Sequence, residues 1–177
     1  GLFNRTLKLM QEGIKLVYVF DGTPPKLKEK ERDRRKELKV EVMKQYKQAM
    51  EDEDVEEMKK YAGRTSRLTS EMVEEAKELL TALGIPYVEA PSEGEAQAAH
   101  MAVQGDAYAV ISQDADSLLF GAPRVVRNLN ITGKRKKPGS VVYTTIQPEL
   151  ITLSEVLNGL QLTQDQLIVL SILVGTD

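Results

Sequence analysis

The sequence predicts an α/β protein in which a mostly parallel β-sheet is flanked by helices. Short runs rich in β-branched and aromatic residues alternate with longer runs of helical periodicity, an order typical of parallel sheets with helices on both faces. The run Ala107–Ser112 is apolar or small throughout, as expected of a strand covered on both faces. With 177 residues, the chain is long enough for one domain.

Composition excludes several kinds of site. There is no cysteine, which rules out a disulfide framework, a thiolate metal site and a cysteine nucleophile. A zinc hydrolase or a Ser-His-Asp enzyme would depend on the single histidine, His100, which disfavours both. No apolar run approaches the ~20 residues of a membrane span, and no signal-peptide pattern is present. The net charge of −3 makes the distribution of charge more informative than its sum.

The first half of the chain predicts a helix, two strands and a long charged insertion between the strands. Gly13 ends the first helix, and Pro24 and Pro25 prevent the first strand from continuing. A break is expected near Gly63. The predicted elements are a helix at 2–12, a strand at 14–20, helical segments at 28–50 and 55–83, and a strand at 85–90.

The second half predicts another helix and strand, a β-hairpin and two closing helices. Thr163 and Gln166 match a capping box at the start of the last helix. The stretch "TGKRKKPG" places basic residues at the tip of the hairpin. The predicted elements are a helix at 92–103, a strand at 107–112, a helical turn at 116–120, a hairpin over 124–146, and helices at 154–160 and 164–173.

Carboxylates follow three of the predicted strands. An aspartate follows the first, a glutamate pair the second and an aspartate pair the third, so parallel neighbours would bring them to one sheet edge. So many carboxylates cannot all ionise without compensation, and ligation by oxygen alone favours Mg²⁺ or Mn²⁺. Two such ions suit phosphodiester hydrolysis. The candidate ligands are Asp21, Glu93, Glu95, Asp114, Asp116 and, after the last apolar helix, Asp177.

Each acidic residue also has an interpretation that needs no metal. Ser92 and Glu95 match a capping box, and Glu93 suits the dipole of a first helical turn. The aspartates could be a helix cap and a turn residue. These interpretations do not predict that acids gather at three successive strand ends. Gly94 also fits the metal-site interpretation, because a glycine between the two glutamates keeps the first helical turn open to close approach.

Ten consecutive charged residues, Lys28–Glu37, begin shortly after the first strand. A solvated helix with pairs such as Glu31–Arg35 would explain the run, at a few tenths of a kcal/mol per pair. The alternative is a basic stripe beside the acidic residues that holds phosphates. The candidate nucleic-acid contacts are Lys28, Arg32, Arg35, Lys36 and Lys39 in this helix, and Lys134, Arg135, Lys136 and Lys137 in the hairpin.

Four stretches together resemble one family: "VYVFDGTPPKLK", "LGIPYVEAPSEGEAQAA", "SQDADSLLFGAPRVVRNL" and "ILVGTD". They are similar to the flap endonucleases, which are structure-specific 5′-nucleases related to the xeroderma pigmentosum G-type nucleases. The residues in these stretches resemble those of archaeal members. The resemblance implies a PIN-like 5′-nuclease core in which the six acids bind two Mg²⁺ ions, with Mn²⁺ as a substitute. It implies that Lys28 and Arg35 are catalytic and contact the scissile phosphate. It also implies a helical arch at 26–64 through which a single-stranded flap threads.

The resemblance further implies segments beyond both ends of this chain. The family's first strand, with another metal-site aspartate, would precede Gly1, and a duplex-binding module and a clamp-binding tail would follow Asp177. We therefore expect an internal piece of a longer nuclease that acts on branched DNA with a 5′ flap in replication and repair. Its expected partners are that DNA and a sliding clamp, with no membrane. Its expected location is the cytoplasm of an archaeon, or the nucleus in a eukaryote.

Two other functions remain open at this point. In a phosphotransferase or phosphatase, the D-x-D motif would supply an aspartyl nucleophile. Gln113 separates that motif from the strand end, however, and the motif leaves the glutamate pair unexplained. An acid-stable phosphoenzyme would favour this function. The other candidate is a non-catalytic DNA-binding fragment, which metal-independent flap binding without cleavage would favour.

Overall fold

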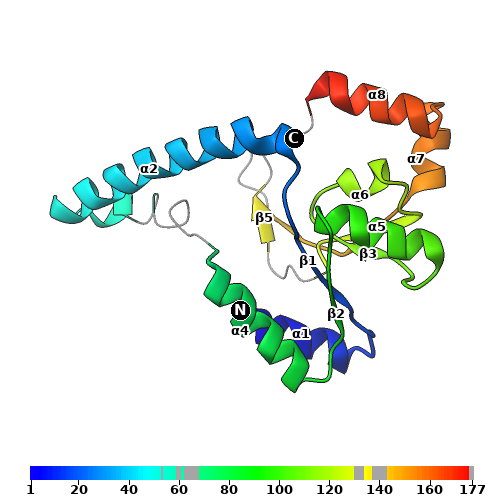
Figure 1. The fold of residues 1–177 in the computed structure, drawn as a ribbon, viewed down its shortest axis with the longest axis horizontal. Coiled ribbons are helices and arrows are strands. Elements are labelled where there is room, and N and C mark those ends of the chain that lie inside the picture. The colour runs from blue at the N-terminus through cyan, green and yellow to red at the C-terminus, as the bar shows by residue number, and fades with distance from the viewer. Residues whose placement is uncertain (53, 59–60, 62–67, 130–133, 137–142, 176–177) are drawn as a thin grey trace. The chain divides into compact units, whose positions relative to one another are not determined.

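The computed structural model describes residues 1–52, 54–58, 61, 68–129, 134–136 and 143–175. The chain divides into two compact units, which Figure 1 follows by colour along the chain. The first unit combines Gly1–Thr23 with Gly84–Thr176, and the second comprises Pro24–Leu83. The second unit contains the charged run Lys28–Glu37, and in the sequence it lies between the two segments of the first unit.

The first unit is an α/β structure, as predicted. Strand β1 (Tyr18–Phe20) pairs in parallel with β2 (Tyr87–Glu89). Strand β3 (Val110–Ile111) pairs in parallel with β4 (Arg124–Arg127), and β4 pairs antiparallel with β7 (Glu149–Thr152). Among the described strands, hydrogen bonds therefore join β1 only to β2, and β3 only to β4.

The predicted hairpin differs from the observed pairing. Residues 124–127 do not pair with a segment near 143; they form β4, which lies between β3 and β7. The antiparallel pair consists instead of β5 (Lys134–Lys136) and β6 (Tyr143–Thr145), so these basic residues form a strand rather than a tip. Periodicity identifies strands but not their partners. The sequence pattern also did not predict strand β7.

The helices of the first unit lie within about two residues of their predicted bounds. The capping box of the last helix forms as predicted, because the Thr163 hydroxyl accepts the Gln166 N–H and the Gln166 side chain accepts the Thr163 N–H. These helices are α1 (Leu2–Gln11), α5 (Gly94–Gln104), α6 (Asp116–Leu119), α7 (Leu153–Leu160) and α8 (Gln164–Val174).

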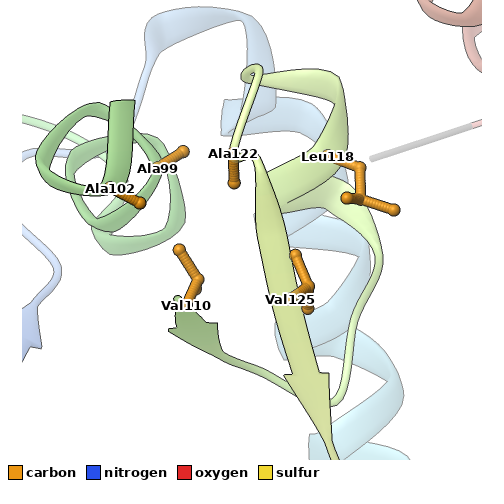
Figure 2. Close-up of a cluster of buried hydrophobic side chains, with 6 residues drawn as sticks. All are labelled: Ala99, Ala102, Val110, Leu118, Ala122 and Val125. Carbon is orange, nitrogen blue, oxygen red and sulfur yellow. The ribbon is translucent and has the colours of Figure 1, made fainter. Parts of the chain in front are cut away.

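A small hydrophobic core lies between α5, α6 and the β3–β4 pair (Figure 2). Helix α5 contributes alanines, whose small side chains let it approach β3 closely. The loop between β3 and α6, which carries both aspartates of the D-x-D motif, is therefore rooted in the core at each end. The core residues are Ala99, Ala102, Val110, Leu118, Ala122 and Val125.

The second unit is helical where it is described. A 3₁₀ turn, η1 (Lys26–Lys28), leads into the long helix α2 (Glu29–Glu51), and α4 (Ser70–Ala82) follows after helical turns at 55–58. Thr69 caps α4 by accepting the Met72 N–H at 3.3 Å. No helix in the described part of the chain combines the length and apolar content needed to cross a membrane.

Candidate active site

Acidic residues follow the carboxyl ends of β1, β2 and β3, as the sequence predicted. Among the described residues, however, β1–β2 and β3–β4 belong to two separate sheets and do not share one sheet edge. Asp21 directly follows β1. Glu93 occupies the N-cap position of α5, after β2, and Glu95 lies in the first turn of that helix. Asp114 lies in the loop after β3, and Asp116 is the first residue of α6.

Asp21 binds the start of α5. Its Oδ1 accepts the backbone N–H of Gly94 at 2.7 Å, although 73 positions separate the two residues. The first N–H groups of a helix lack partners within it and carry partial positive charge, so a carboxylate is favoured there. A Cβ at Gly94 would lie 3.0 Å from the same oxygen. Gly94 therefore permits the close approach expected from the sequence.

Gly22 brings the ends of β1 and β2 together. Its N–H donates to the carbonyl of Ser92 at 2.6 Å. A Cβ at this position would lie 1.9 Å from the carbonyl oxygen of Ala90, a distance that real atoms do not adopt. The "DG" pair thus fixes Asp21 against the second strand, a role that sequence reasoning did not assign to Gly22.

Glu95 is the acidic residue that interacts with Asp21, Asp114 and Asp116. Its half-buried carboxylate accepts a hydrogen bond from the Ser112 hydroxyl, with 2.6 Å between Oε1 and Oγ. Burial raises the pKa of Glu95, the Ser112 hydrogen bond lowers it, and the charges of Asp116, Asp114 and Asp21 raise it further. Acids from the ends of three strands therefore share one electrostatic environment.

Two of the metal-free interpretations are wrong. Ser92 and Glu95 do not form a capping box, because Glu93 occupies the N-cap position of α5 and the Glu95 carboxylate binds Ser112 instead. Asp116 does not cap α6, whose N-cap position belongs to Ala115. Neither acid is therefore explained by local helix capping.

The loop that carries the D-x-D motif is held by neighbouring polar groups. The N–H of Asp114 donates to the Ser112 hydroxyl at 3.1 Å, and Arg127 Nε donates to the Gln113 carbonyl at 3.1 Å. Sequence reasoning missed Ser112 and Arg127. The Ser112–Asp114 spacing is typical of a serine turn, a local signal that could have found Ser112. The contact of Arg127 depends on β4 lying beside β3, which the sequence does not reveal.

The acidic side chains fit a divalent cation in chemistry, since all their donors are oxygens and their charges oppose one another. In the described ranges, however, no three His, Cys, Asp or Glu side chains are placed to hold one ion together. The carboxylates are thus near neighbours that do not form a closed set of ligands. Asp177, the sixth candidate ligand, lies outside the described residues.

The basic candidates of the second unit lie on η1 and α2. Lys28 ends η1 and is half-buried, whereas Arg35 is exposed on α2. Arg35 Nε contacts Glu31 at 3.1 Å, so the predicted i,i+4 pair forms. Arg34 binds the same carboxylate at 2.8 and 2.9 Å, and its hydrogen bond is the largest of the influences that lower the pKa of Glu31.

For the remaining basic candidates, the structure describes at most the backbone. Lys137 lies outside the described residues. Those described by backbone only are Arg32, Lys36 and Lys39 in α2, and Lys134, Arg135 and Lys136 in β5.

A groove of about 990 Å³ in the first unit separates β1 from β3. Its lining includes Val19, Asp21, Glu95 and Ile111. The expectation that β3 is covered on both faces is wrong here, because Ile111 is 40% exposed. The groove is thus lined by residues of both strands, beside Asp21 and Glu95.

The fold and site together define an α/β protein with an acidic cluster at the carboxyl ends of its parallel strands. The chain matches the family models "XPG I-region" over residues 84–177 and "XPG N-terminal domain" over residues 1–42. The chain therefore belongs to the XPG family. The first match contains both acidic pairs, and the second contains Asp21, Lys28 and Arg35. The family resemblance carried by the four sequence motifs is confirmed, and the family is generally metal-dependent.

Relatives and solved structures agree with this assignment. The chain is 59% identical over 177 residues to flap endonuclease 1 of Pyrococcus furiosus and 56% identical to that of Ignicoccus hospitalis. It spans 52% and 51% of their lengths, about half of each. Flap endonuclease-1 from Methanococcus jannaschii is 51% identical and matches 99% of this chain, with a TM-score of 0.66 over 52% of its own chain. The catalytic core of Rad2 in complex with a DNA substrate is 30% identical and matches 99% of this chain, with a TM-score of 0.65 over 45% of its own.

Proposed function

We propose that the protein containing this chain is a structure-specific endonuclease that cleaves 5′ flaps of branched DNA by metal-dependent phosphodiester hydrolysis, in replication and repair. One observation carries the proposal: acids from three strand ends converge on Glu95. Identity above 50% with flap endonucleases, spread over the whole chain, supports the substrate class.

The proposed cofactor is Mg²⁺, as two ions for which Mn²⁺ can substitute. When bound, these cations would polarise the scissile phosphate and stabilise the charge that develops on its oxygens. The chain's own contribution is to hold the acidic side chains in register through the Asp21–Gly94 and Ser112–Glu95 hydrogen bonds. The proposed ligands are Asp21, Glu93, Glu95, Asp114, Asp116 and Asp177.

The proposed role of Lys28 and Arg35 is to contact the scissile phosphate and offset its negative charge. The segment 26–64 would form the arch that receives the single-stranded flap, and the other basic residues of α2 and of 134–137 would bind DNA phosphates. Phosphate contacts position a duplex without reading its bases, so the enzyme would recognise branched shape and a free single-stranded end.

The groove between β1 and β3 suggests how the sheet is completed. Successive N–H groups of a strand point to opposite sides. Tyr18 and Ser112 donate toward β2 and β4, to the carbonyls of Pro86 and Val126, so the N–H groups of Val19 and Ile111 face the other way. We propose that a strand which precedes Gly1 in the full-length protein pairs with β1 and β3 in this groove. A duplex-binding module and a tail that binds a sliding clamp would follow the chain, and a cytoplasmic location in an archaeon is proposed.

The test uses the full-length protein with a 5′-flap duplex and Mg²⁺. We expect cleavage at the flap junction, and a loss of at least about 100-fold in Asp114→Asn and Glu95→Gln, because removal of an essential electrostatic group typically costs 10²–10³ in kcat. The matched control is Glu155→Gln, which removes an exposed carboxylate from the first turn of α7. Undiminished cleavage by both site variants would sink the ligand assignment. Flap binding without cleavage by the wild-type protein would instead indicate a DNA-binding module.

A further inference from the structure

The hydroxyl of Ser112 joins two acidic segments of the candidate site. It donates to Oε1 of Glu95 at 2.6 Å and accepts the backbone N–H of Asp114 at 3.1 Å. A serine hydroxyl can donate only one hydrogen bond, and here its acceptor is the Glu95 carboxylate. The first turn of α5 and the loop after β3 are thus tied together through one oxygen atom.

Ser112 is itself fixed by the sheet. Its N–H donates to the carbonyl of Val126 at 3.2 Å, which extends the β3–β4 ladder beyond Ile111. Arg127, the next residue of β4, holds the carbonyl of Gln113. Val125 of the same strand is completely buried in the core. The hydroxyl therefore occupies a position set by packed backbone.

Glu95 needs such an anchor because the charges of three other carboxylates repel its own. Asp21, Asp114 and Asp116 are near enough to interact electrostatically with its carboxylate. A glutamate side chain has several accessible rotamers, and repulsion favours those that turn toward solvent. The Ser112 hydrogen bond opposes that turn and keeps one carboxylate oxygen beside β3.

We propose that Ser112 is a positioning residue of this site: its hydroxyl fixes Glu95 against the loop that carries Asp114, in the arrangement that receives a divalent cation. The inference rests on the proposed function, because it assigns Ser112 a role in the same site. Ser112 acts through Glu95 and the loop and does not itself bind the cation.

The experiment compares Ser112→Thr with Ser112→Val in the full-length protein. Threonine keeps the hydroxyl, whereas valine has nearly the same shape without it. Mn²⁺ binding is titrated by electron paramagnetic resonance in the absence of DNA. We expect Ser112→Val to weaken Mn²⁺ binding about 10- to 100-fold, as loss of a hydrogen bond to a metal ligand typically does, while Ser112→Thr stays close to wild type. Ser154→Ala, an exposed serine of α7, is the control and binds as wild type.

Flap cleavage supplies a second readout. At saturating DNA, kcat falls in Ser112→Val with little change in the KM for DNA, and added Mn²⁺ recovers part of the loss. Circular dichroism establishes that each variant is folded, and Ser112→Ala replaces the valine variant if that one is not. Equal Mn²⁺ binding by the threonine and valine variants would overturn the inference, as would a wild-type protein that binds no Mn²⁺. A wild type that binds Mn²⁺ but leaves flaps uncut contradicts only the proposed function.

Discussion

At the scale of single residues, Gly22 is the described glycine at which a side chain would meet the closest neighbour. Its missing side chain lets the end of β1 lie directly against the Ala90 carbonyl, and its N–H is bound to Ser92. The hydrogen bond from the Gly94 N–H to Asp21 thus depends on a glycine at position 22. A side chain at position 22 would push the whole aspartate-bearing segment away from its partner strand.

We predict that Gly22→Ala lowers the free energy of unfolding by about 1–3 kcal/mol, the usual cost of overpacking, because backbone must move to accept the methyl group. The measurement is urea unfolding followed by circular dichroism. The control is Gly159→Ala in α7, where a Cβ meets nothing within 4 Å. That variant is expected to gain up to about 1 kcal/mol from helix propensity. A Gly22→Ala protein as stable as wild type would contradict the steric argument.

At the scale of elements, the helix starts differ in how their free N–H groups are satisfied. Thr163 and Gln166 cap α8 locally, and Thr69 caps α4. In helix α5, the first N–H is instead accepted by Asp21, which lies in the segment after β1. The start of α5 therefore depends on tertiary structure, whereas the start of α8 is specified by adjacent sequence.

We predict that Thr163→Ala destabilises the protein by about 1 kcal/mol, because the N–H of Gln166 loses its acceptor. Thr163→Ser keeps the oxygen and is expected to lose only a small part of that stability. Urea midpoints of the three proteins, together with hydrogen exchange at Gln166, provide the measurement. Equal destabilisation by alanine and serine would mean that the methyl group of threonine, and not its hydroxyl, supports the helix.

At the scale of the whole molecule, the sequence predicted what depends on local patterns. The helices of the first unit and strands β1 to β4 follow from periodicity, and the acids follow from the residues shortly after Phe20, Glu89 and Ile111. The neighbours of β4, the existence of β7 and the Ser112–Glu95 bond did not follow. Each of these depends on which segments meet in space, and a strand such as Glu149–Thr152 becomes recognisable only when an edge of β4 is open to it.

We predict that hydrogen exchange at Val19 and Ile111 slows at least about tenfold when this chain is extended to the full-length protein, since pairing protects amides that face the groove. Ser112 is the matched control, because its amide already donates to Val126. Mass spectrometry with residue-level resolution makes the comparison. Unchanged exchange at both groove amides would exclude strand pairing at that place.

The parallel pair β1–β2 has a further consequence for how the molecule can vary. The pair aligns Phe20 with Glu89, so the second unit is an insertion in the chain between two strands that are hydrogen-bonded to each other. The entropic penalty of closing a flexible connection grows only logarithmically with its length, by about 0.6 kcal/mol for each doubling. Adding flexible residues to the second unit is therefore expected to leave the β1–β2 pair nearly as stable as before. Loop closure therefore constrains the length of the second unit only weakly, while Gly22 and Asp21 hold together the strands at its two ends.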